Sequence, residues 1–388
     1  MRKVSIIFLI LLCSSLVYGQ KYTIKGKVID KTSGLGISFA SVWIKGTFVG
    51  VATDLEGKYE LEVPKDKSDS VLQFSSVGYK DEEFDFNLIK GKKDVLNVSL
   101  QSRLFIFNEV NITGESLVLQ KYLKNVCKNI VDNYPQKSFS SDVYYSYNKK
   151  IDSTKSEIKN SLLRVYDDEG YKRSSVDKTY KSVNYKFLKV DKQSENGFLG
   201  GGSTYVDNIL YCDIVRSVGN ILDINNLSDF MLERYADIDD KGINVIVIGY
   251  RLKDNQSDIV NVDGLKSYSG ILYINKENFA VIKNILKIQL NKVPNLGLPI
   301  VLKPNEVKGN DVILNIETNY KKVGSKYYLS QILYHQQYNK ELITIDYRPQ
   351  QYNLSKPIKV DGREYYEELK ADSKYWSIFS INKDLEIK

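Results

Sequence analysis

The chain contains one histidine, His335, and this single imidazole limits the chemistry that the sequence can support. A catalytic zinc ion generally takes three protein ligands and keeps a fourth position open. No His-x-x-Glu pair occurs, so a zinc site would have to combine His335 with a cysteine and a carboxylate. A Ser-His-Asp triad would also need His335, but the sequence has no Gly-x-Ser-x-Gly elbow. On an expected strand beside two glutamines, His335 is interpreted as a structural or surface side chain.

Two other features contain residues of catalytic type. Residues 200–203, Gly-Gly-Gly-Ser, lack the Gly-Lys-Ser/Thr ending of a phosphate-binding loop, so we expect a plain loop there. Glycoside hydrolysis needs two carboxyl groups that face each other at a set separation. Acidic clusters of the C-terminal half could supply them, and this alternative stays open; they are Asp237, Asp239 and Asp240, and Glu367 and Glu368. The sequence assigns no catalytic residue, no cofactor-binding residue and no metal ligand.

Composition and charge define the class of protein that must position these groups. The 388 residues are 42% hydrophobic and 27% charged, with a mean hydropathy of -0.32, which excludes a disordered chain and a polytopic membrane protein. The formal net charge is +7, but basic residues alternate with acidic ones, as in Lys-Asp-Glu-Glu at 80–83. Nucleic-acid binding requires basic residues that are clustered. We therefore predict no nucleic-acid partner and no cofactor.

Residues 1–19 have the pattern of a signal peptide. A basic start precedes an apolar run over 4–17 that is too short to span a bilayer comfortably, and the next residues fit cleavage before Gln20. Leu12 stands before Cys13 where a lipobox requires a small residue, so lipidation is not expected. No later apolar stretch reaches 18 residues, so no transmembrane helix is expected in the mature chain. We predict an exported protein of the periplasm or outer membrane, with peripheral membrane association allowed.

Two cysteines remain after that cleavage, Cys127 and Cys212. An oxidising compartment permits a disulfide between them, although spacing in the sequence does not show whether they are close. Cys127 lies on the apolar side of a predicted helix, which favours a buried free thiol.

Short alternating segments separated by turn residues predict a β-sandwich over residues 20–102. Its expected strands include 24–29, 40–44, 59–63, 71–75 and 97–100. Trp43 is expected in or beside the core of this sandwich. Residues 53–57, Thr-Asp-Leu-Glu-Gly, predict a hydrogen-bonded turn. A Ca²⁺ loop would need more oxygen ligands than Asp54 and Glu56 supply.

Ordered motifs in this segment resemble a known family. They are Gly-Lys-Val-Ile-Asp at 26–30, Ala-Ser-Val at 40–42, Thr-Asp-Leu-Glu-Gly-Lys-Tyr at 53–59, Val-Gly-Tyr at 77–79 and Phe-Asn-Glu-Val-Asn-Ile at 107–112. They are similar to the signature of the carboxypeptidase-regulatory-like domain, over residues 22–113. The resemblance implies a transthyretin-like β-sandwich of the kind found at the start of many outer-membrane TonB-dependent receptors. It implies no peptidase, because His-x-x-Glu is absent.

Residues 116–388 are predicted to form a second domain, after a linker strand at 103–115. Ser116 can N-cap a helix that ends at Asn133, just before Tyr134 and a proline. Its apolar residues recur at helical spacing; they are Leu119, Leu123, Val126 and Ile130. From residue 138 onward, alternation predicts a large curved antiparallel sheet. The fold class is therefore mainly β, with an α+β arrangement in this domain.

Two hairpins and two short helices are expected within that sheet. Turn residues at 276–278 would join strands 270–275 and 279–290, and turn residues at 323–325 would join strands over 312–323 and 327–334. Alternate residues from Val312 to Tyr320 are expected on one face. The short helices are placed at 227–233 and 364–371.

Further motifs follow in the second half. They are the helix ending in Asn-Tyr-Pro, a Tyr-rich strand at 143–147, Gly-Ile-Leu-Tyr-Ile at 270–274, Lys-Tyr-Tyr-Leu at 326–329 and Tyr-Trp at 375–376. Together they resemble a family of envelope proteins of unknown function that join the same regulatory-like domain to a β-rich module. That module is also similar to lipoprotein-carrier half-barrels, a likeness of fold alone.

These observations predict an exported, non-enzymatic protein that binds or scaffolds in the cell envelope, with an envelope protein or a glycan as its partner. Two alternatives stay open, a hydrolase with a carboxylate site in the β-rich domain and a carrier of an apolar ligand in the concave sheet. Apolar inward rows around a dry pocket would favour the carrier. Converging carboxylates in a cleft would favour the hydrolase.

Overall fold

The computed structural model describes a defined part of the chain. It comprises residues 21–31, 34, 36–37, 40–45, 47, 49–53, 57–65, 70–76, 79–89, 95–101, 114–151, 155–173, 182–191, 205–235, 238–240, 243–254, 257–260, 262, 264–291, 311–363, 369–379 and 385–388. The chain divides into two compact units, Met1–Ile106 and Phe107–Lys388. The predicted signal peptide, most of the predicted linker strand and residues 200–203 lie outside the described residues.

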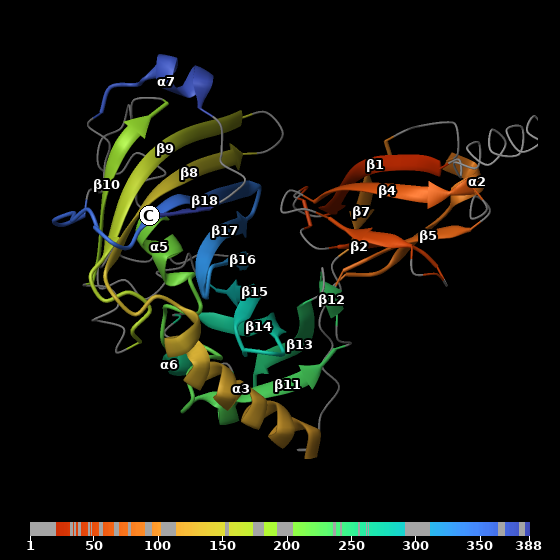
Figure 1. Ribbon diagram of the computed structural model, residues 1–388, viewed down its shortest axis with the longest axis horizontal. Helices are drawn as coiled ribbons and strands as arrows, with labels where there is room; N and C mark the ends of the chain where they lie inside the picture. Colours follow the sequence, from red (N-terminus) through yellow and green to blue (C-terminus); the bar gives the residue numbers. More distant parts are fainter. Residues whose placement is uncertain are drawn as a thin grey trace, which may run out of the picture. The chain divides into compact units, whose positions relative to one another are not determined.

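Unit 1 is a sandwich of two small sheets (Figure 1). One sheet has the strand order β4-β1-β7 and the other β3-β2-β5-β6. The bounds are β1 Lys21–Asp30, β2 Ser41–Ile44, β3 Gly50–Ala52, β4 Lys58–Pro64, β5 Val71–Ser75, β6 Glu82–Asp85 and β7 Val98–Leu100, with the short helix α2 at Phe86–Ile89. The predicted β-sandwich is confirmed.

Strict alternation produces the core of unit 1. In β4, Tyr59, Leu61 and Val63 are buried while the residues between them are exposed, because successive side chains of a strand point to opposite faces. Phe74 of β5 is fully buried. Its ring lies edge-on to Tyr59 and to Phe84, with centroids 5.6 and 5.5 Å away. Such aromatic contacts add to the stability gained from burial alone.

Trp43 does not belong to this core, so that part of the sequence prediction is wrong. β2 buries Val42 and Ile44, and the period of two places Trp43 on the opposite face, where it is half-buried. Trp43 lies opposite Gly50 of β3, where an added Cβ would come within 2.6 Å of the Trp43 Cβ. The tryptophan therefore packs across a strand pair outside the core.

The turn after β3 is anchored by Thr53. Its hydroxyl accepts a hydrogen bond from the Ala40 amide at 2.8 Å and donates one to the Ile37 carbonyl at 2.6 Å. Gly57 supplies the positive φ of +78° that favours glycine. Asp54 and Glu56 lie outside the described residues.

Unit 2 is built on one large sheet of twelve strands. Its main path is β10-β9-β8-β18-β17-β16-β15-β14-β13-β11, with β12 beside β13 and β19 beside β18. The strand bounds are β8 Phe139–Ile151, β9 Lys155–Asp167, β10 Val183–Val190, β11 Phe230–Arg234, β12 Ile238–Asp240, β13 Ile243–Leu252, β14 Leu265–Asn275, β15 Val281–Leu290, β16 Val312–Val323, β17 Lys326–Tyr338, β18 Glu341–Asn353 and β19 Glu386–Ile387.

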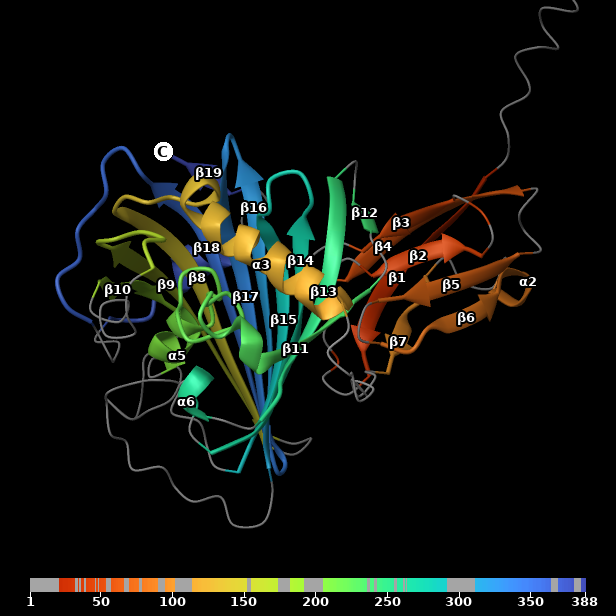
Figure 2. The same ribbon diagram turned by 90° about the horizontal axis from the view of Figure 1, so that it is seen from below.

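The sheet of unit 2 curves, and α3, α5 and α6 lie on its concave side (Figures 1 and 2), whereas α7 packs on Tyr144 of the opposite face. The helix bounds are α3 Gly114–Asn133, α5 Tyr205–Tyr211, η3 Leu227–Asp229, α6 Ser257–Val260 and α7 Ser373–Ile378. The apolar stripe of α3, predicted from Leu119 to Ile130, is buried in one cluster with the inward side chains of the strands. None of the described helices is long and apolar enough to cross a membrane.

Both predicted hairpins are confirmed, as is the end of α3 at Asn133. The alternate residues of β16 from Val312 to Tyr320 are buried as expected. The mainly β fold class, with a helix and a curved antiparallel sheet in the second part of the chain, is confirmed as well.

The helix predicted at 227–233 is wrong. Only the single turn η3 forms there, and the chain continues as β11, which pairs with β13 and turns Phe230 and Leu232 inward. An alternating apolar pattern and a sheet edge available for pairing outweigh helical propensity in so short a segment. Of the helix predicted at 364–371, residues 364–368 lie outside the described residues. The described helix begins later, at α7, where the Asp372 carboxylate accepts from the Tyr375 amide at 3.0 Å.

We expect Phe74→Ala to destabilise unit 1 by about 3–5 kcal/mol, because it empties a fully buried ring site. Trp43→Ala should cost clearly less, because that ring is half-buried on the outer face. Hydrogen exchange of the β1 and β4 amides in the full chain measures both. Equal losses of protection would place Trp43 in the core after all.

Candidate binding pocket

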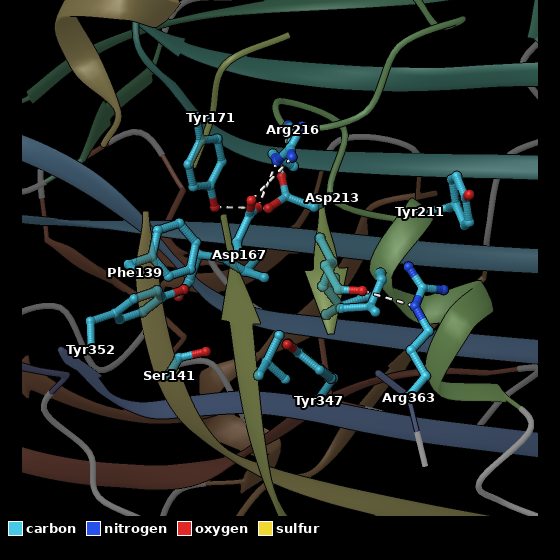
Figure 3. A pocket seen from close by; sticks show the side chains of 15 residues that line it. Phe139, Ser141, Asp167, Tyr171, Tyr211, Asp213, Arg216, Tyr347, Tyr352 and Arg363 are labelled. Carbon is cyan, nitrogen blue, oxygen red and sulfur yellow. Dashed lines mark hydrogen bonds and ion pairs between the residues drawn. The ribbon is translucent and has the colours of Figure 1, made fainter. Parts of the chain in front are cut away.

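A pocket lies on the concave side of the unit 2 sheet, between its strands and α5 (Figure 3). Fifteen residues line it: Phe139, Ser141, Val165, Asp167, Tyr171, Val183, Leu210, Tyr211, Asp213, Arg216, Leu329, Ile332, Tyr347, Tyr352 and Arg363. Its walls are mostly apolar and aromatic, and its charged residues gather at two places.

Strand alternation and one register shift direct the wall residues inward. Phe139 and Ser141 of β8 are two positions apart and therefore share a face. Tyr347 and Tyr352 of β18 are five positions apart, which in a regular strand would put them on opposite faces. A register shift between Pro349 and Gln351 restores the face, as β-bulges do beside functional sites.

A buried ion pair forms the first charged place. The Arg216 Nε donates to Asp167 Oδ2 at 2.7 Å, and Nη2 donates to Asp167 Oδ1 at 3.2 Å and to the Ser182 hydroxyl at 2.6 Å. Asp167 Oδ1 also accepts the amides of Glu169 and Gly170, each at 3.0 Å. Arg216 and Asp167 are 4% and 3% exposed. Asp167 is thus held by four donors on the protein.

Asp213 lies beside this pair, and neutral donors hold it. The Tyr171 hydroxyl donates to Asp213 Oδ2 at 2.8 Å, the Tyr320 hydroxyl donates to Oδ1, and the Arg216 amide donates to Oδ1 at 3.2 Å. Tyr171 is positioned in turn by its ring, which stacks on Tyr134 with centroids 5.2 Å apart. Figure 3 shows the Tyr171, Asp213, Asp167 and Arg216 side chains converging.

Burial determines the protonation of this cluster. Burial raises the pKa of the Asp213 carboxyl, and the hydrogen bonds from Tyr320 and Tyr171 only partly oppose it. Burial also raises the pKa of Asp167, against the attraction of the Arg216 guanidinium. The pKa values of Tyr171 and Tyr320 are raised well above their usual range, chiefly by burial, so both phenols stay protonated as donors.

The second charged place is Arg363, beside α5. Its Nη1 donates to Asp207 Oδ1 at 2.8 Å and its Nε donates to the Val183 carbonyl at 2.8 Å. The Arg363 and Asp207 side chains are 9% and 2% exposed. Both arginines of the pocket are therefore paired with a buried carboxylate.

The free space in the pocket is small. It offers about 50 Å³ to the centres of water-sized spheres. Since about 10–15 Å³ by this measure holds one water, the pocket fits a few waters or the end of a short chain. This volume is too small for a complete lipid acyl chain.

The structure places His335, singled out from the sequence, away from this pocket. His335 on β17 is 8% exposed, and its Nδ1 lies 3.3 Å from the Thr344 hydroxyl oxygen. The structural interpretation of this imidazole is therefore right and the surface one wrong. β12 carries Asp239 and Asp240, neither of which lines the pocket. Asp237, Glu367 and Glu368 lie outside the described residues.

Neither Cys127 nor Cys212 forms a disulfide. The Cys127 thiol donates to the Leu222 carbonyl at 3.0 Å, and the Cys212 thiol donates to the Asn208 carbonyl at 3.2 Å. Within the described part of the chain, no three histidine, cysteine, aspartate or glutamate side chains are grouped so that they could hold a metal ion.

Sequence reasoning missed the residues of the polar cluster. Asp167 lies 49 positions before Arg216, whereas Asp213 and Arg216 are in one segment. Nothing in the local sequence marks these three residues as a cluster. One usable signal was present, because Asp167 follows the inward residues Leu163 and Val165 of β9 at the same spacing of two. A charge at such a position is buried and must find a partner.

Comparison with known proteins identifies unit 1. Residues 24–112 match the family model of the CarboxypepD_reg-like domain, so the family predicted for this segment is confirmed. TonB-dependent receptor P3 of Formosa agariphila is 28% identical over 115 residues, which are 29% of this chain and 11% of the receptor. The chain thus spans only about a tenth of the length of that relative.

Solved structures resemble the chain weakly. A Vibrio parahaemolyticus domain described as an outer membrane lipoprotein-sorting protein aligns over 62% of this chain and 94% of its own, with 8% identity and a TM-score of 0.30. A LolA superfamily protein from Nitrosomonas europaea covers the same shares, with 11% identity and a TM-score of 0.25. Likenesses at this level lead to no conclusion about function.

We expect Arg216→Ala to destabilise unit 2 by about 3–5 kcal/mol, because it leaves the Asp167 carboxylate buried without its cation. The double variant Asp167→Asn, Arg216→Met should lose clearly less, because no uncompensated charge remains. Denaturant unfolding followed by Trp376 fluorescence, in a Trp43→Phe background, measures both. A double variant as unstable as Arg216→Ala would contradict the assignment.

Asp213 should give unit 2 a specific dependence on pH. Because its pKa is higher in the folded than in the unfolded chain, its stabilising contribution is complete below the unfolded value and is lost as pH rises through the folded value. The free energy of unfolding of the wild type, minus that of Asp213→Asn, should therefore fall as the pH rises above about 4, the ordinary pKa of an aspartate. The same fluorescence assay measures it, and a difference that grows with pH would contradict the burial argument.

Proposed function

We propose that this protein is an exported, non-enzymatic binding protein of the cell envelope, and that unit 2 takes a small ligand in its pocket. The signal-peptide pattern of residues 1–19 supports export, with a mature chain that begins at Gln20. The CarboxypepD_reg-like domain and the local similarity to a TonB-dependent receptor support the envelope. Location in the periplasm or at the outer membrane is part of this proposal.

One observation carries the choice of binding over hydrolysis. Both carboxylates that converge at the pocket are already held by donors of the protein itself, Asp167 by a guanidinium and two amides, and Asp213 by two phenols and an amide. A carboxylate hydrolase needs one carboxyl to give up a proton and another to receive one or to attack. Each oxygen of the two carboxylates already accepts a hydrogen bond from the protein, and this opposes a role in proton transfer or nucleophilic attack.

The walls of the pocket support a ligand with an apolar portion. Eight wall residues are apolar or aromatic and buried: Phe139, Val165, Tyr171, Val183, Leu329, Ile332, Tyr347 and Tyr352. Pockets of this composition gain affinity from apolar burial and orientation from a few polar groups. The volume restricts the buried portion to a short chain or a single ring.

Unit 1 is proposed to provide the attachment to an envelope partner, a protein or a glycan. Its support is the match to the CarboxypepD_reg-like domain, together with the local similarity to a TonB-dependent receptor. Peripheral association with a membrane remains part of the same proposal.

Toluene tests the binding function, because one ring fits the apolar walls and carries no polar group. Ligand-observed NMR on the full mature chain should show saturable binding that Val165→Phe abolishes, since the added ring fills the pocket. Ile158→Phe is the matched control, because Ile158 is a 41% exposed residue of the same strand. Ile332→Phe is a second filling variant in case Val165→Phe does not fold.

Chromogenic esters and glycosides test the hydrolase alternative. We expect no turnover that Asp167→Asn or Asp213→Asn removes. Turnover abolished by either substitution in a folded protein, or toluene binding that survives both filling variants, would contradict the proposed function.

A further inference from the structure

Two buried hydroxyl groups of the pocket have no hydrogen-bond partner among the described side chains and backbone groups. They belong to Ser141 on β8 and Tyr347 on β18, whose residues are 2% and 3% exposed. Figure 3 shows the Ser141 and Tyr347 side chains near each other, below Phe139 and Asp167 in the view. An unpaired hydroxyl in such a site is unfavourable until it finds a partner, so this place is prepared for a polar group from outside the chain.

Six other polar side chains of the lining are bonded within the protein. The Tyr352 hydroxyl donates to the Leu329 carbonyl at 3.0 Å, and the Tyr171 hydroxyl donates to Asp213. Asp167 and Arg216 form the ion pair described above, and Arg363 pairs with Asp207. A ligand that needs these groups would have to break bonds that already exist. Ser141 and Tyr347 can receive a ligand at no such cost.

The balance of charge decides which polar group fits. The lining contains two aspartates and two arginines, so its formal charge is zero, and each arginine is paired with a buried carboxylate. An anionic group would meet the Asp167 and Asp213 carboxyl groups, and a cationic group would meet two guanidiniums. Either would also lose its hydration without gaining a counter-ion, which is costly. Hydroxyls, in contrast, both donate and accept, and so they suit an uncharged group.

The geometry points to a ligand with a short apolar body and one uncharged hydrogen-bonding group, such as an alcohol or an amide, bound by the Ser141 and Tyr347 hydroxyls. This inference rests on the proposed function, because it names the chemical class of ligand for the same pocket. The apolar body lies against Val165 and Ile332, and the polar group lies between the two hydroxyls.

Probes with the same number of carbon atoms and different polar groups test the inference on the full mature chain. 1-Pentanol, pentanoate and pentylammonium are titrated at pH 7 by ligand-observed NMR, both directly and in competition with toluene. We expect 1-pentanol to bind at least about tenfold more tightly than either ion, and butanamide more tightly than butanoate. Ser141→Ala and Tyr347→Phe should each weaken 1-pentanol about fivefold, the size of one neutral hydrogen bond.

Controls separate this inference from the function it rests on. Ser141→Ala and Tyr347→Phe each remove one oxygen and keep the rest of the side chain, so each should weaken 1-pentanol by a larger factor than toluene. Ser267→Ala on β14 and Tyr338→Phe at the end of β17 lie outside the lining and should leave 1-pentanol binding unchanged.

Three results would overturn the inference. Pentanoate or pentylammonium bound as tightly as 1-pentanol would show that the charge argument is wrong. Toluene bound with no hydroxyl-dependent gain for 1-pentanol would show that the two groups hold only water, and the binding function would stand. No binding of toluene or of any probe would remove both the inference and the function.

Discussion

The buried pair of Asp167 and Arg216 is the interaction on which the pocket depends. Asp167 ends β9, Arg216 belongs to the segment after α5, and Ser182 precedes β10, so one guanidinium ties three parts of the chain together. Removing one partner of a buried ion pair costs several kcal/mol, while the complete pair costs little. The segment after α5 can therefore pack on the concave sheet only in the arrangement that pairs them, and this arrangement also places Asp213 between Tyr171 and Tyr320.

Local chemistry prepares the position of Asp167. Gly170 has a positive φ of +63°, and an added Cβ would come within 2.4 Å of the Lys137 carbonyl oxygen, so the turn after β9 requires glycine there. The Tyr171 amide donates to the Pro135 carbonyl at 2.8 Å, which fixes the turn to the end of α3. The Asn-Tyr-Pro motif, which the sequence shows as the end of a helix, thus also contacts the polar cluster, because the Tyr134 ring stacks on Tyr171.

Sequence reasoning predicted the parts of the fold that repeat with a fixed period. The stripe from Leu119 to Ile130 and the row from Val312 to Tyr320 are repeated patterns, and burial of one face follows from them. The position of Trp43 and the structure at 227–233 were predicted wrongly, because each depends on neighbouring strands. Strands β3 and β5 flank the strand of Trp43, and Phe230 pairs with β13. The pocket was beyond reach for the same reason, since its charged residues meet only after the sheet has curved.

The hydrogen-bond donors that surround Asp213 have fixed protonation states. Acid–base catalysis needs groups whose protonation changes during the reaction, near the working pH. Here burial holds the Tyr171 and Tyr320 phenols in their protonated form, and Arg216 keeps its proton in the presence of Asp167. The groups that surround Asp213 therefore present the same donors throughout the physiological range. Selectivity in such a site comes from the shape of the walls and from Ser141 and Tyr347, whose hydroxyls turn to match a ligand without any change of charge.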